Sequence, residues 1–328
     1  MDNQFTKEAL TYITALRIAV FSCVSTMRSS TLGMSLSSIT LYLFALLTLL
    51  PTPPRVNASP VQPEHSHADH IQPDHSHSDH ILAGAIGPDC VDGAKYTGEA
   101  AGRNITIADV PTYYSPARGD SDSEDSKKVV LYYSDIYGPF YENNFLLQDW
   151  FAGNGYHVLG LDYFFGDPIQ NHPEPDFDMA AWVAKSRAQA AEALPKWNKA
   201  VREKFGPDAK FVAVGYCFGA PYALEIGATD EVVATAFAHP SQVTESHFEN
   251  VTKPVLLSLA ETDGAFPTAA SHRALDILMR RKATYHAQVF SGVSHGFATR
   301  ADPNDANAVW AKEQSAKSIL GWFDRFSK

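Results

Sequence analysis

Blocks of apolar and polar positions alternate along the chain from about residue 105, and their lengths match those of strands and helices. Short apolar runs, which are typical of buried strands, occur at 129–133, 157–161, 211–214, 254–260 and 284–290, after paired short strands within 105–114. Helices are predicted at about 143–153, 177–193, 196–204, 220–226 and 304–326, with Pro195 separating the second from the third. This alternation predicts an α/β fold whose mostly parallel sheet carries helices on both faces.

One strand-like run enters a turn rich in small residues. Residues 211–214 lead into Gly215-Tyr216-Cys217-Phe218-Gly219, and the helical segment 220–226 follows. Strand, sharp turn and helix in this order are typical of the nucleophile elbow of α/β-hydrolases, with Cys217 where serine is usual. The flanking glycines would allow the strand and the helix to approach closely. The alternative is a buried core cysteine among small residues.

Two further polar residues follow predicted strands. Asp263 comes directly after the run 254–260, and His295 comes after 284–290. The chain order nucleophile, acid, base is the order of the α/β-hydrolase fold. Because open α/β sheets bind ligands beyond the carboxyl ends of their strands, we expect Cys217, Asp263 and His295 to meet there.

The first 58 residues have the pattern of an N-terminal extension followed by a signal peptide. An apolar run at 39–50 has the length of a signal-peptide core, and Val56-Asn57-Ala58 offers a small-residue cleavage site. The protein is therefore predicted to be secreted, with an uncleaved membrane anchor as the alternative. Asn104 and Asn250 begin glycosylation sequons, which are compatible with secretion.

Residues 59–87 are predicted to be a disordered linker. A His-rich ten-residue sequence at 62–71 recurs almost unchanged at 72–81. Two polar copies are too few to pack as a repeat array. Their imidazoles and carboxylates could bind Zn²⁺ or Cu²⁺, although a solvated tether explains them as well. The acidic run 119–126 is predicted to be a solvated loop.

Charge limits the partners of the chain. Its 328 residues carry a formal net charge of -11, which argues against a general binder of nucleic acid or anionic membranes. We expect no stable membrane association once the signal peptide is removed. The sequence leaves the oligomeric state open.

Four motifs in order resemble the dienelactone hydrolase family. They are 134–138, 162–168, 215–219 and 294–297, and the resemblance covers about 88–328, the predicted catalytic domain. It is closest to fungal, extracellular-type members that have a Cys-containing segment such as Asp89-Cys90 at the start of the domain. The resemblance implies a Cys217-His295-Asp263 triad that hydrolyses a small ester or lactone. It implies no cofactor, and we predict no metal site in this domain.

Further site residues follow from the fold and from the resemblance. The backbone N–H groups of Phe218 and Ile136 are predicted to form the oxyanion hole. Asp135 stands where classical family members have a glutamate that interacts with the resting nucleophile. Arg300 is a candidate for binding a substrate carboxylate, or else a surface charge or an ion-pair partner. Tyr137 lies on a strand-end loop and could line an apolar pocket, although packing explains it nearly as well.

Cys90 and His239 are two further residues that the sequence singles out. Cys90 is not expected to form a disulfide, because Cys23 would leave with the signal peptide and Cys217 is needed as a thiol. His239 precedes Pro240 at a predicted strand end. A structural turn explains His239 better than a place in the pocket wall.

Two functions are compatible with these patterns. The first is cysteine-dependent hydrolysis of a carboxylic ester or lactone through a thioester acyl-enzyme. The second is an extracellular metal-binding protein that uses the His-rich repeats and keeps the hydrolase fold as an inactive scaffold.

Overall fold

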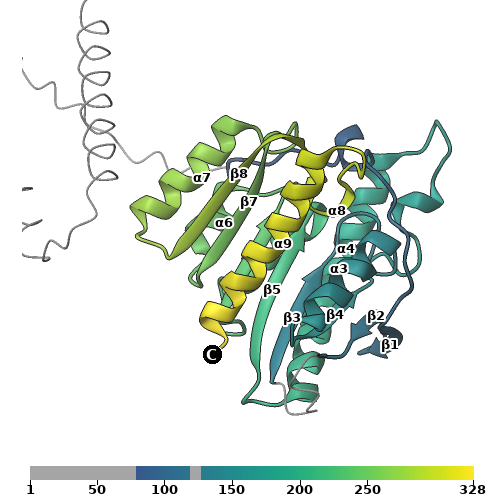
Figure 1. The fold of residues 1–328 in the computed structure, drawn as a ribbon, viewed down its shortest axis with the longest axis vertical. Helices are drawn as coiled ribbons and strands as arrows, with labels where there is room; N and C mark the ends of the chain where they lie inside the picture. The colour runs from purple at the N-terminus through teal and green to yellow at the C-terminus, as the bar shows by residue number, and fades with distance from the viewer. Residues whose placement is uncertain (1–78, 119–126) are drawn as a thin grey trace, which may run out of the picture. The chain divides into compact units, whose positions relative to one another are not determined.

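A single sheet forms the centre of the folded unit. The computed structural model describes residues 79–118 and 127–328, within a compact unit that spans Pro73–Lys328. Eight strands lie in the order β1-β2-β4-β3-β5-β6-β7-β8 (Figure 1). Their bounds are β1 Arg103–Ile107, β2 Val110–Ser115, β3 Lys128–Tyr133, β4 His157–Leu161, β5 Lys210–Tyr216, β6 Ala234–Ala238, β7 Val255–Thr262 and β8 Tyr285–Ser294.

The sheet is mostly parallel, as the alternating pattern predicts. All pairs from β4 through β3, β5, β6 and β7 to β8 are parallel. Only β1 with β2 and β2 with β4 are antiparallel. The carboxyl ends of the parallel strands therefore meet at one edge of the sheet, where this class of fold places its ligands.

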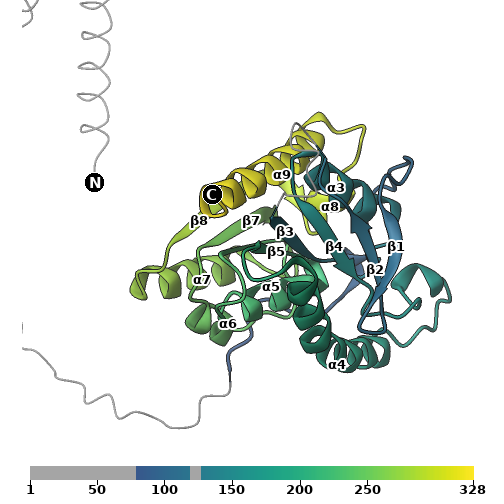
Figure 2. The same cartoon turned by 90° about the horizontal axis from the view of Figure 1, so that it is seen from below.

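Helices cover both faces of the sheet. The helices are α3 Glu142–Gly153, α4 Met179–Phe205, α5 Ala220–Ile226, α6 Glu245–Asn250, α7 Thr268–Arg280, α8 Phe297–Arg300 and α9 Ala306–Phe326. Figure 2 shows α3, α8 and α9 on one face and α4 to α7 on the other. Successive residues of β3 show the strand alternation: Val130 and Tyr132 pack in the core beneath α3 and α9, and Leu131 packs with α4.

The prediction of two helices separated at Pro195 is wrong. One helix, α4, runs from Met179 to Phe205 with Pro195 inside it. A proline inside a helix removes one backbone hydrogen bond and costs about 3 kcal/mol. Trp182 and Trp197, on either side of the proline, are both buried in the same core. Burial of large aromatic side chains offsets such a cost, and a local pattern does not show this.

The two glycines of the elbow allow the close approach that the sequence predicts. A Cβ atom at Gly215 would overlap the carbonyl of Gly219, and one at Gly219 would overlap the carbonyl of Tyr133 on β3. Both obstacles are backbone atoms, which cannot rotate away. The steric demand is therefore met by glycine at both positions.

Gly219→Ala is expected to lower the free energy of unfolding by roughly 2 to 3 kcal/mol, because the new methyl group has no free volume. Urea unfolding followed by circular dichroism measures this change. Gly153→Ala is the matched control, since a Cβ atom there meets nothing within 4 Å. Equal unfolding midpoints for the two variants would contradict the steric explanation.

An N-terminal strap, defined here as residues 79–102, precedes β1 and packs against the domain. Leu82 and Ala83 are buried, and both donate backbone hydrogen bonds to Val243 O. Ile81 forms an isolated antiparallel bridge with Thr244. The ordered chain thus starts before Pro88, where the resemblance places the start of the catalytic domain.

Several sequence predictions fall outside the described residues. The extension and signal peptide, the His-rich repeats up to residue 78 and the acidic run 119–126 are among them. Within the described residues, no helix combines the length and apolar character of a membrane span. Asn104 and Asn250 are both exposed.

Candidate active site

Cys217 lies on a strained turn at the carboxyl end of the central strand β5. It begins the short 3₁₀ helix Cys217–Gly219, which leads directly into α5. Its φ of 48° is in the left-handed region, which a non-glycine residue adopts at a cost of order 1–3 kcal/mol. This confirms the predicted order of strand, sharp turn and helix. The Cys217 thiol is fully buried and lies 3.7 Å from Ser241 Oγ.

Asp263 and His295 meet as predicted from their positions after β7 and β8. His295 Nδ1 lies 2.9 Å from Asp263 Oδ1 and 3.1 Å from Oδ2. The carboxylate also accepts hydrogen bonds from the backbone N–H groups of Ala265 and Phe266. Because a carboxylate is an acceptor, Nδ1 carries a proton, and Nε2 is the nitrogen free to exchange one with a thiol.

A second thiol, which was not predicted from the sequence, occupies the site. Cys90 Sγ lies 3.3 Å from His295 Nε2. The two sulfur atoms of Cys90 and Cys217 and a ring nitrogen of His295 all lie within 4.8 Å of one another. The chain has only three cysteines, and Cys90 is 127 positions before Cys217. That scarcity and the Cys-containing segment shared with fungal family members were the available signals, and no local pattern links the two residues.

Charge in this cluster is distributed over both thiols and the imidazole. Burial alone would lower the pKa of His295, but its hydrogen bonds to Asp263 and Cys90 outweigh burial and raise the pKa to about 9. The Cys217 thiol lowers the pKa of Cys90, burial opposes this, and His295 lowers it further. Burial and the neighbouring Cys90 raise the pKa of Cys217. These shifts favour placing the negative charge of the cluster on Cys90, beside a protonated His295, rather than on Cys217.

This charge distribution has a spectroscopic signature. Because the pKa of Cys90 is lowered, its thiolate should persist at pH 7 and disappear only on further acidification, whereas an ordinary thiol ionises near pH 8.5. Thiolate absorbance at 240 nm, titrated from pH 4 to 9, measures this ionisation. The absorbance at pH 7 should be lost in Cys90→Ser and in His295→Gln. A wild-type titration that coincides with that of Cys90→Ser below pH 8 would contradict the assignment.

Asp135 and Arg300 form a buried ion pair beside the cluster. Asp135 Oδ2 accepts from Arg300 Nη1 and, at 3.0 Å, from the Thr299 hydroxyl. Asp135 Oδ1 accepts from Asn144 Nδ2 at 2.7 Å and from the N–H of Tyr137 at 3.1 Å. Both side chains are almost completely buried. The Asp135 carboxylate is thus held by four donors at the carboxyl end of β3.

Arg300 also fixes the strap over the site. Its Nη2 donates to Cys90 O at 2.9 Å, and its Nε donates to Asp92 O at 3.0 Å. Together with the ion pair to Asp135, these contacts agree with the alternative that Arg300 is an ion-pair partner. Its role in binding a substrate carboxylate stays a prediction. The strap is further held by Asn143 Nδ2, which donates to Ala94 O at 2.9 Å.

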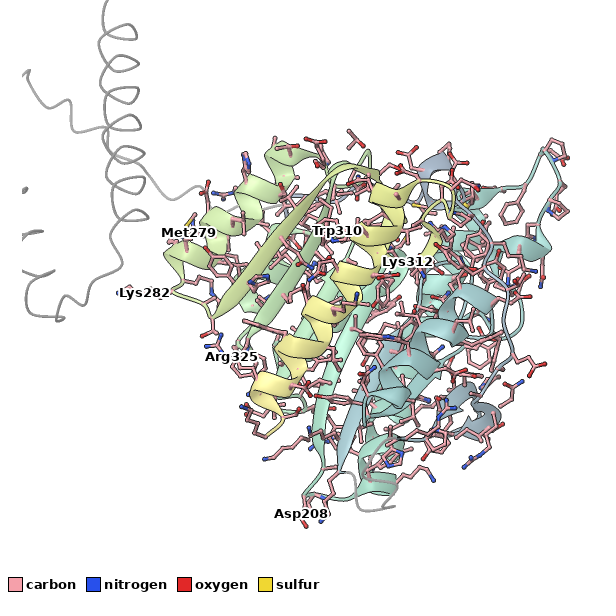
Figure 3. All side chains as sticks on the ribbon, viewed as in Figure 1. Asp208, Met279, Lys282, Trp310, Lys312 and Arg325 are labelled. Atoms are coloured by element: carbon pink, nitrogen blue, oxygen red, sulfur yellow. The ribbon has the colours of Figure 1, made fainter. Side chains whose placement is uncertain are left out.

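The strap covers the cluster. Cys217, Cys90 and His295 are 0%, 1% and 4% exposed, so a substrate reaches the sulfur atoms only if groups around them move. Tyr137 is partly buried beside it, and its hydroxyl donates to Val91 O at 2.9 Å. Lys312 of α9, labelled in Figure 3, lies 3.9 Å from the ring centroid of Tyr96 in the same strap.

Open space lies next to Tyr137. One cavity of about 380 Å³ is lined by Tyr137 together with Gly138 and Pro168. A second, of about 410 Å³, is lined by Tyr137, Val91 and Phe177. The size of both suits a small molecule. The strap residue Val91 lines the second cavity and follows Cys90 directly in the chain.

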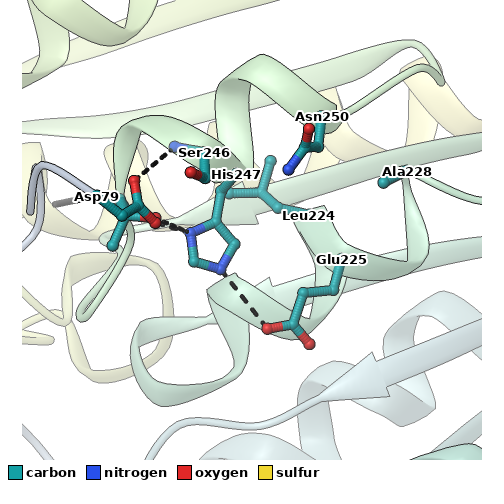
Figure 4. A pocket seen from close by; sticks show the side chains of 8 residues that line it. Asp79, Leu224, Glu225, Ala228, Ser246, His247 and Asn250 are labelled. Carbon is teal, nitrogen blue, oxygen red and sulfur yellow. Dashed lines mark hydrogen bonds and ion pairs between the residues drawn. The ribbon is translucent and has the colours of Figure 1, made fainter. Parts of the chain in front are cut away.

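A further cavity lies away from the triad. Its volume is about 290 Å³, and Figure 4 shows it between α5 and α6. His247 Nε2 lies 3.6 Å from a Glu225 oxygen there, and Asp79 accepts from the N–H of Ser246. None of the triad residues lines it. It is therefore not the space in which a substrate would reach Cys217.

The two predicted oxyanion donors follow strands at the centre of the sheet, next to Cys217 or on the strand beside it. Phe218 is the residue after Cys217, and Ile136 follows β3, the strand paired with β5. Both are completely buried. The loop that carries Ile136 is held by Ile169, whose N–H donates to Ile136 O at 3.1 Å. The use of these two N–H groups as donors stays a prediction.

His239 packs against the imidazole of the predicted base. It is fully buried with φ 35°, and its ring centroid is 5.0 Å from that of His295. Burial and the nearby charge of His295 hold the pKa of His239 well below its usual range. Neutral at pH 7, it adds no positive charge that would displace the proton from His295.

Comparison with known proteins places the chain in a family. The model of the dienelactone hydrolase family matches residues 118–327. The chain is 37% identical over 243 residues to "Dienlactone hydrolase 1" of Gibberella moniliformis, covering 72% of this chain and 92% of that protein. It is 33% identical over 242 residues to "Dienlactone hydrolase 2" of the same fungus, with the same coverage.

A solved structure supports the fold. The putative dienelactone hydrolase from Klebsiella pneumoniae superposes with a TM-score of 0.56 at 17% identity, covering 69% of this chain and 98% of that one. Together with the family match and the fungal relatives, this agrees with the arrangement of strands and helices described above. The chain therefore belongs to the dienelactone hydrolase family and is a hydrolase that acts on ester or lactone bonds.

Proposed function

We propose that the chain hydrolyses its ester or lactone substrate through a thioester on Cys217, with His295 as proton carrier and Asp263 as the group that orients it. The observation that carries the proposal is the pairing of His295 Nδ1 with Asp263 at 2.9 Å beside a strained cysteine on the elbow. In triad chemistry the acid fixes the tautomer of the base and the base serves the nucleophile.

The nucleophile needs one proton shift to become active. In the resting site the negative charge is on Cys90 and the proton is on Cys217. Transfer of that proton to Cys90 leaves a Cys217 thiolate beside the His295 imidazolium, which is the ion pair that cysteine hydrolases use. The net charge of the cluster does not change, so the shift adds no charge to the buried site.

The acyl-transfer steps then follow from the geometry. The Cys217 thiolate attacks the substrate carbonyl, and the N–H groups of Phe218 and Ile136 are the expected donors to the oxyanion. His295 gives its proton to the leaving alkoxide. The neutral imidazole next takes a proton from water, which attacks the thioester and releases the acid.

The same proposal includes secretion of the protein. The apolar run 39–50 supports secretion of the mature protein, and the exposed Asn104 and Asn250 are compatible with it. The alternative, a metal-binding protein with an inactive scaffold, depends on His-rich repeats that lie almost wholly outside the described residues. The nearly complete triad favours the hydrolase.

The test is an activity panel with the purified chain. Wild type and a variant lacking residues 62–78 are assayed against p-nitrophenyl acetate, dienelactone and neutral lactones of similar size. The deletion ends at residue 78 because Asp79 already contacts Ser246 of the domain. Both proteins should hydrolyse at least one of these substrates. No hydrolysis by either protein, together with sub-micromolar zinc binding that the deletion abolishes, would favour the metal-binding alternative.

A further inference from the structure

The second thiol of the site, Cys90, has a position that the triad chemistry alone does not require. Cys90 and Cys217 are both free and buried. Their sulfur atoms lie within 4.8 Å of each other, and a disulfide requires about 2.05 Å. A movement of less than about 3 Å would therefore join them.

The fold allows Cys90, but not Cys217, to make this movement. Cys217 is fixed between β5 and α5, where Gly215 and Gly219 leave no free volume for a shift. Cys90 instead ends the short 3₁₀ helix Pro88–Cys90 in the strap, outside the sheet. Its backbone is held mainly by hydrogen bonds to Arg300 Nη2 and Gly87 O. A small approach of the strap toward the elbow is enough to bring the two sulfur atoms together.

We propose that Cys90 and Cys217 form a reversible disulfide when the protein meets a peroxide or a small-molecule disulfide, and that this bond switches the hydrolase off. The loss of activity depends on the proposed role of Cys217 as nucleophile, whereas formation of the disulfide does not depend on it. In the structure both thiols are free, as expected for Cys90, and the proposal concerns the oxidised protein.

The chemistry balances with either oxidant. With hydrogen peroxide, the Cys90 thiolate attacks one oxygen, the O–O bond breaks, and after protonation the products are a Cys90 sulfenic acid and one water. The Cys217 thiol then attacks that sulfur, and a second water leaves as the S–S bond forms. With a small-molecule disulfide, Cys90 first forms a mixed disulfide and releases one thiol. Cys217 then displaces the second thiol.

The electrostatics of the site support Cys90 as the sulfur that reacts first. A thiolate, rather than a thiol, attacks peroxides and disulfides. The pKa of Cys90 is lowered and the pKa of Cys217 is raised, so the reactive form is present on the strap. The disulfide would also keep Cys217 from oxidation to sulfinic acid, which is irreversible for most proteins.

The same atoms could instead hold a soft metal ion. Two thiolates and an imidazole are ligands that Zn²⁺ prefers. A zinc-inhibited site would also lose activity, but without loss of two hydrogen atoms and without a cross-link between peptides. The experiment therefore needs a mass measurement and a chelator arm.

The experiment compares the Cys23→Ser chain with the same chain carrying Cys90→Ser, which removes the thiol that reacts first with the oxidant but keeps a hydrogen-bonding side chain. Cys90→Ala is a second variant in case the serine is poorly tolerated. Each protein is treated with hydrogen peroxide or oxidised glutathione. Titration of free thiols, intact mass and a non-reducing peptide digest report the bond, and ester hydrolysis reports the activity.

The parent chain should lose both thiols, yield a linked Cys90–Cys217 peptide and lose at least tenfold in activity, which dithiothreitol restores. In the Cys90 variants, no linked peptide should form, and the loss of activity that dithiothreitol reverses should be absent. Retention of both free thiols while activity falls, or inactivation that a chelator reverses without a change in mass, would overturn the proposal. A linked peptide in a protein that had no activity before oxidation would leave the disulfide standing and refute the proposed nucleophile.

Discussion

Cys217→Ala is expected to lower kcat for p-nitrophenyl acetate by at least about 10⁴-fold, because no other group on the elbow can form the acyl-enzyme. Comparison with Cys90→Ser shows which of the two thiols is the nucleophile. Both thiols lie next to His295, but only Cys217 is on the turn between β5 and α5, beside the predicted oxyanion donors. We expect Cys90→Ser to retain activity to within about tenfold of wild type, because His295, which is neutral in the absence of the Cys90 thiolate, can take the proton of Cys217 directly. Steady-state kinetics of the two variants measure both effects.

The opposite ranking of these two variants would contradict the mechanism. If Cys90→Ser were inactive while Cys217→Ala kept its rate, the thiol on the strap would be the nucleophile. Circular dichroism and urea unfolding of each variant show whether an inactive protein is folded. A serine at position 217 gives a second variant with a conserved hydrogen-bonding group.

Asp263→Asn is expected to lower kcat by roughly 10⁴-fold with a smaller change in KM. The asparagine keeps the shape of the side chain but presents an N–H group toward His295 Nδ1, or forces the imidazole into the other tautomer. The backbone N–H groups of Ala265 and Phe266 donate to Oδ1, so the asparagine would keep its carbonyl oxygen there and turn its NH₂ group toward His295. The wild-type pKa of His295, about 9, depends in part on this carboxylate and should fall in the variant.

Kinetics as a function of pH check this second prediction. Asp230→Asn is the matched control, because Asp230 is fully exposed and pairs only with Lys253 on the surface. Its kcat should equal that of wild type. A similar kcat for Asp263→Asn and wild type would remove Asp263 from the mechanism.

The fold and the positions of three candidate site residues could be predicted because their signals are local. Cys217, Asp263 and His295 each follow directly after a buried strand, and parallel strands end at the same edge of the sheet. The glycines of the elbow indicated a close approach, and the carbonyl positions around Gly215 and Gly219 agree with it. Strand alternation likewise predicted the parallel sheet.

The residues that could not be predicted act through contacts distant in sequence. Cys90 reaches His295 across 205 positions. The hydrogen bonds from Arg300 to Cys90 O and Asp92 O also connect the far ends of the domain, and no periodicity records them. The predicted break at Pro195 was wrong for a related reason. The burial of aromatic side chains along α4 outweighs the local tendency of proline to end a helix.

Trapping of the acyl-enzyme tests the central claim most directly. The Cys23→Ser chain is mixed with p-nitrophenyl acetate, quenched in acid within the first turnover, digested and analysed by mass spectrometry. A single acetyl group should be found on the peptide that contains Cys217, and it should disappear as turnover proceeds. An acetyl group on the Cys90 peptide, or ester hydrolysis with no acylated cysteine under conditions that preserve thioesters, would contradict the mechanism.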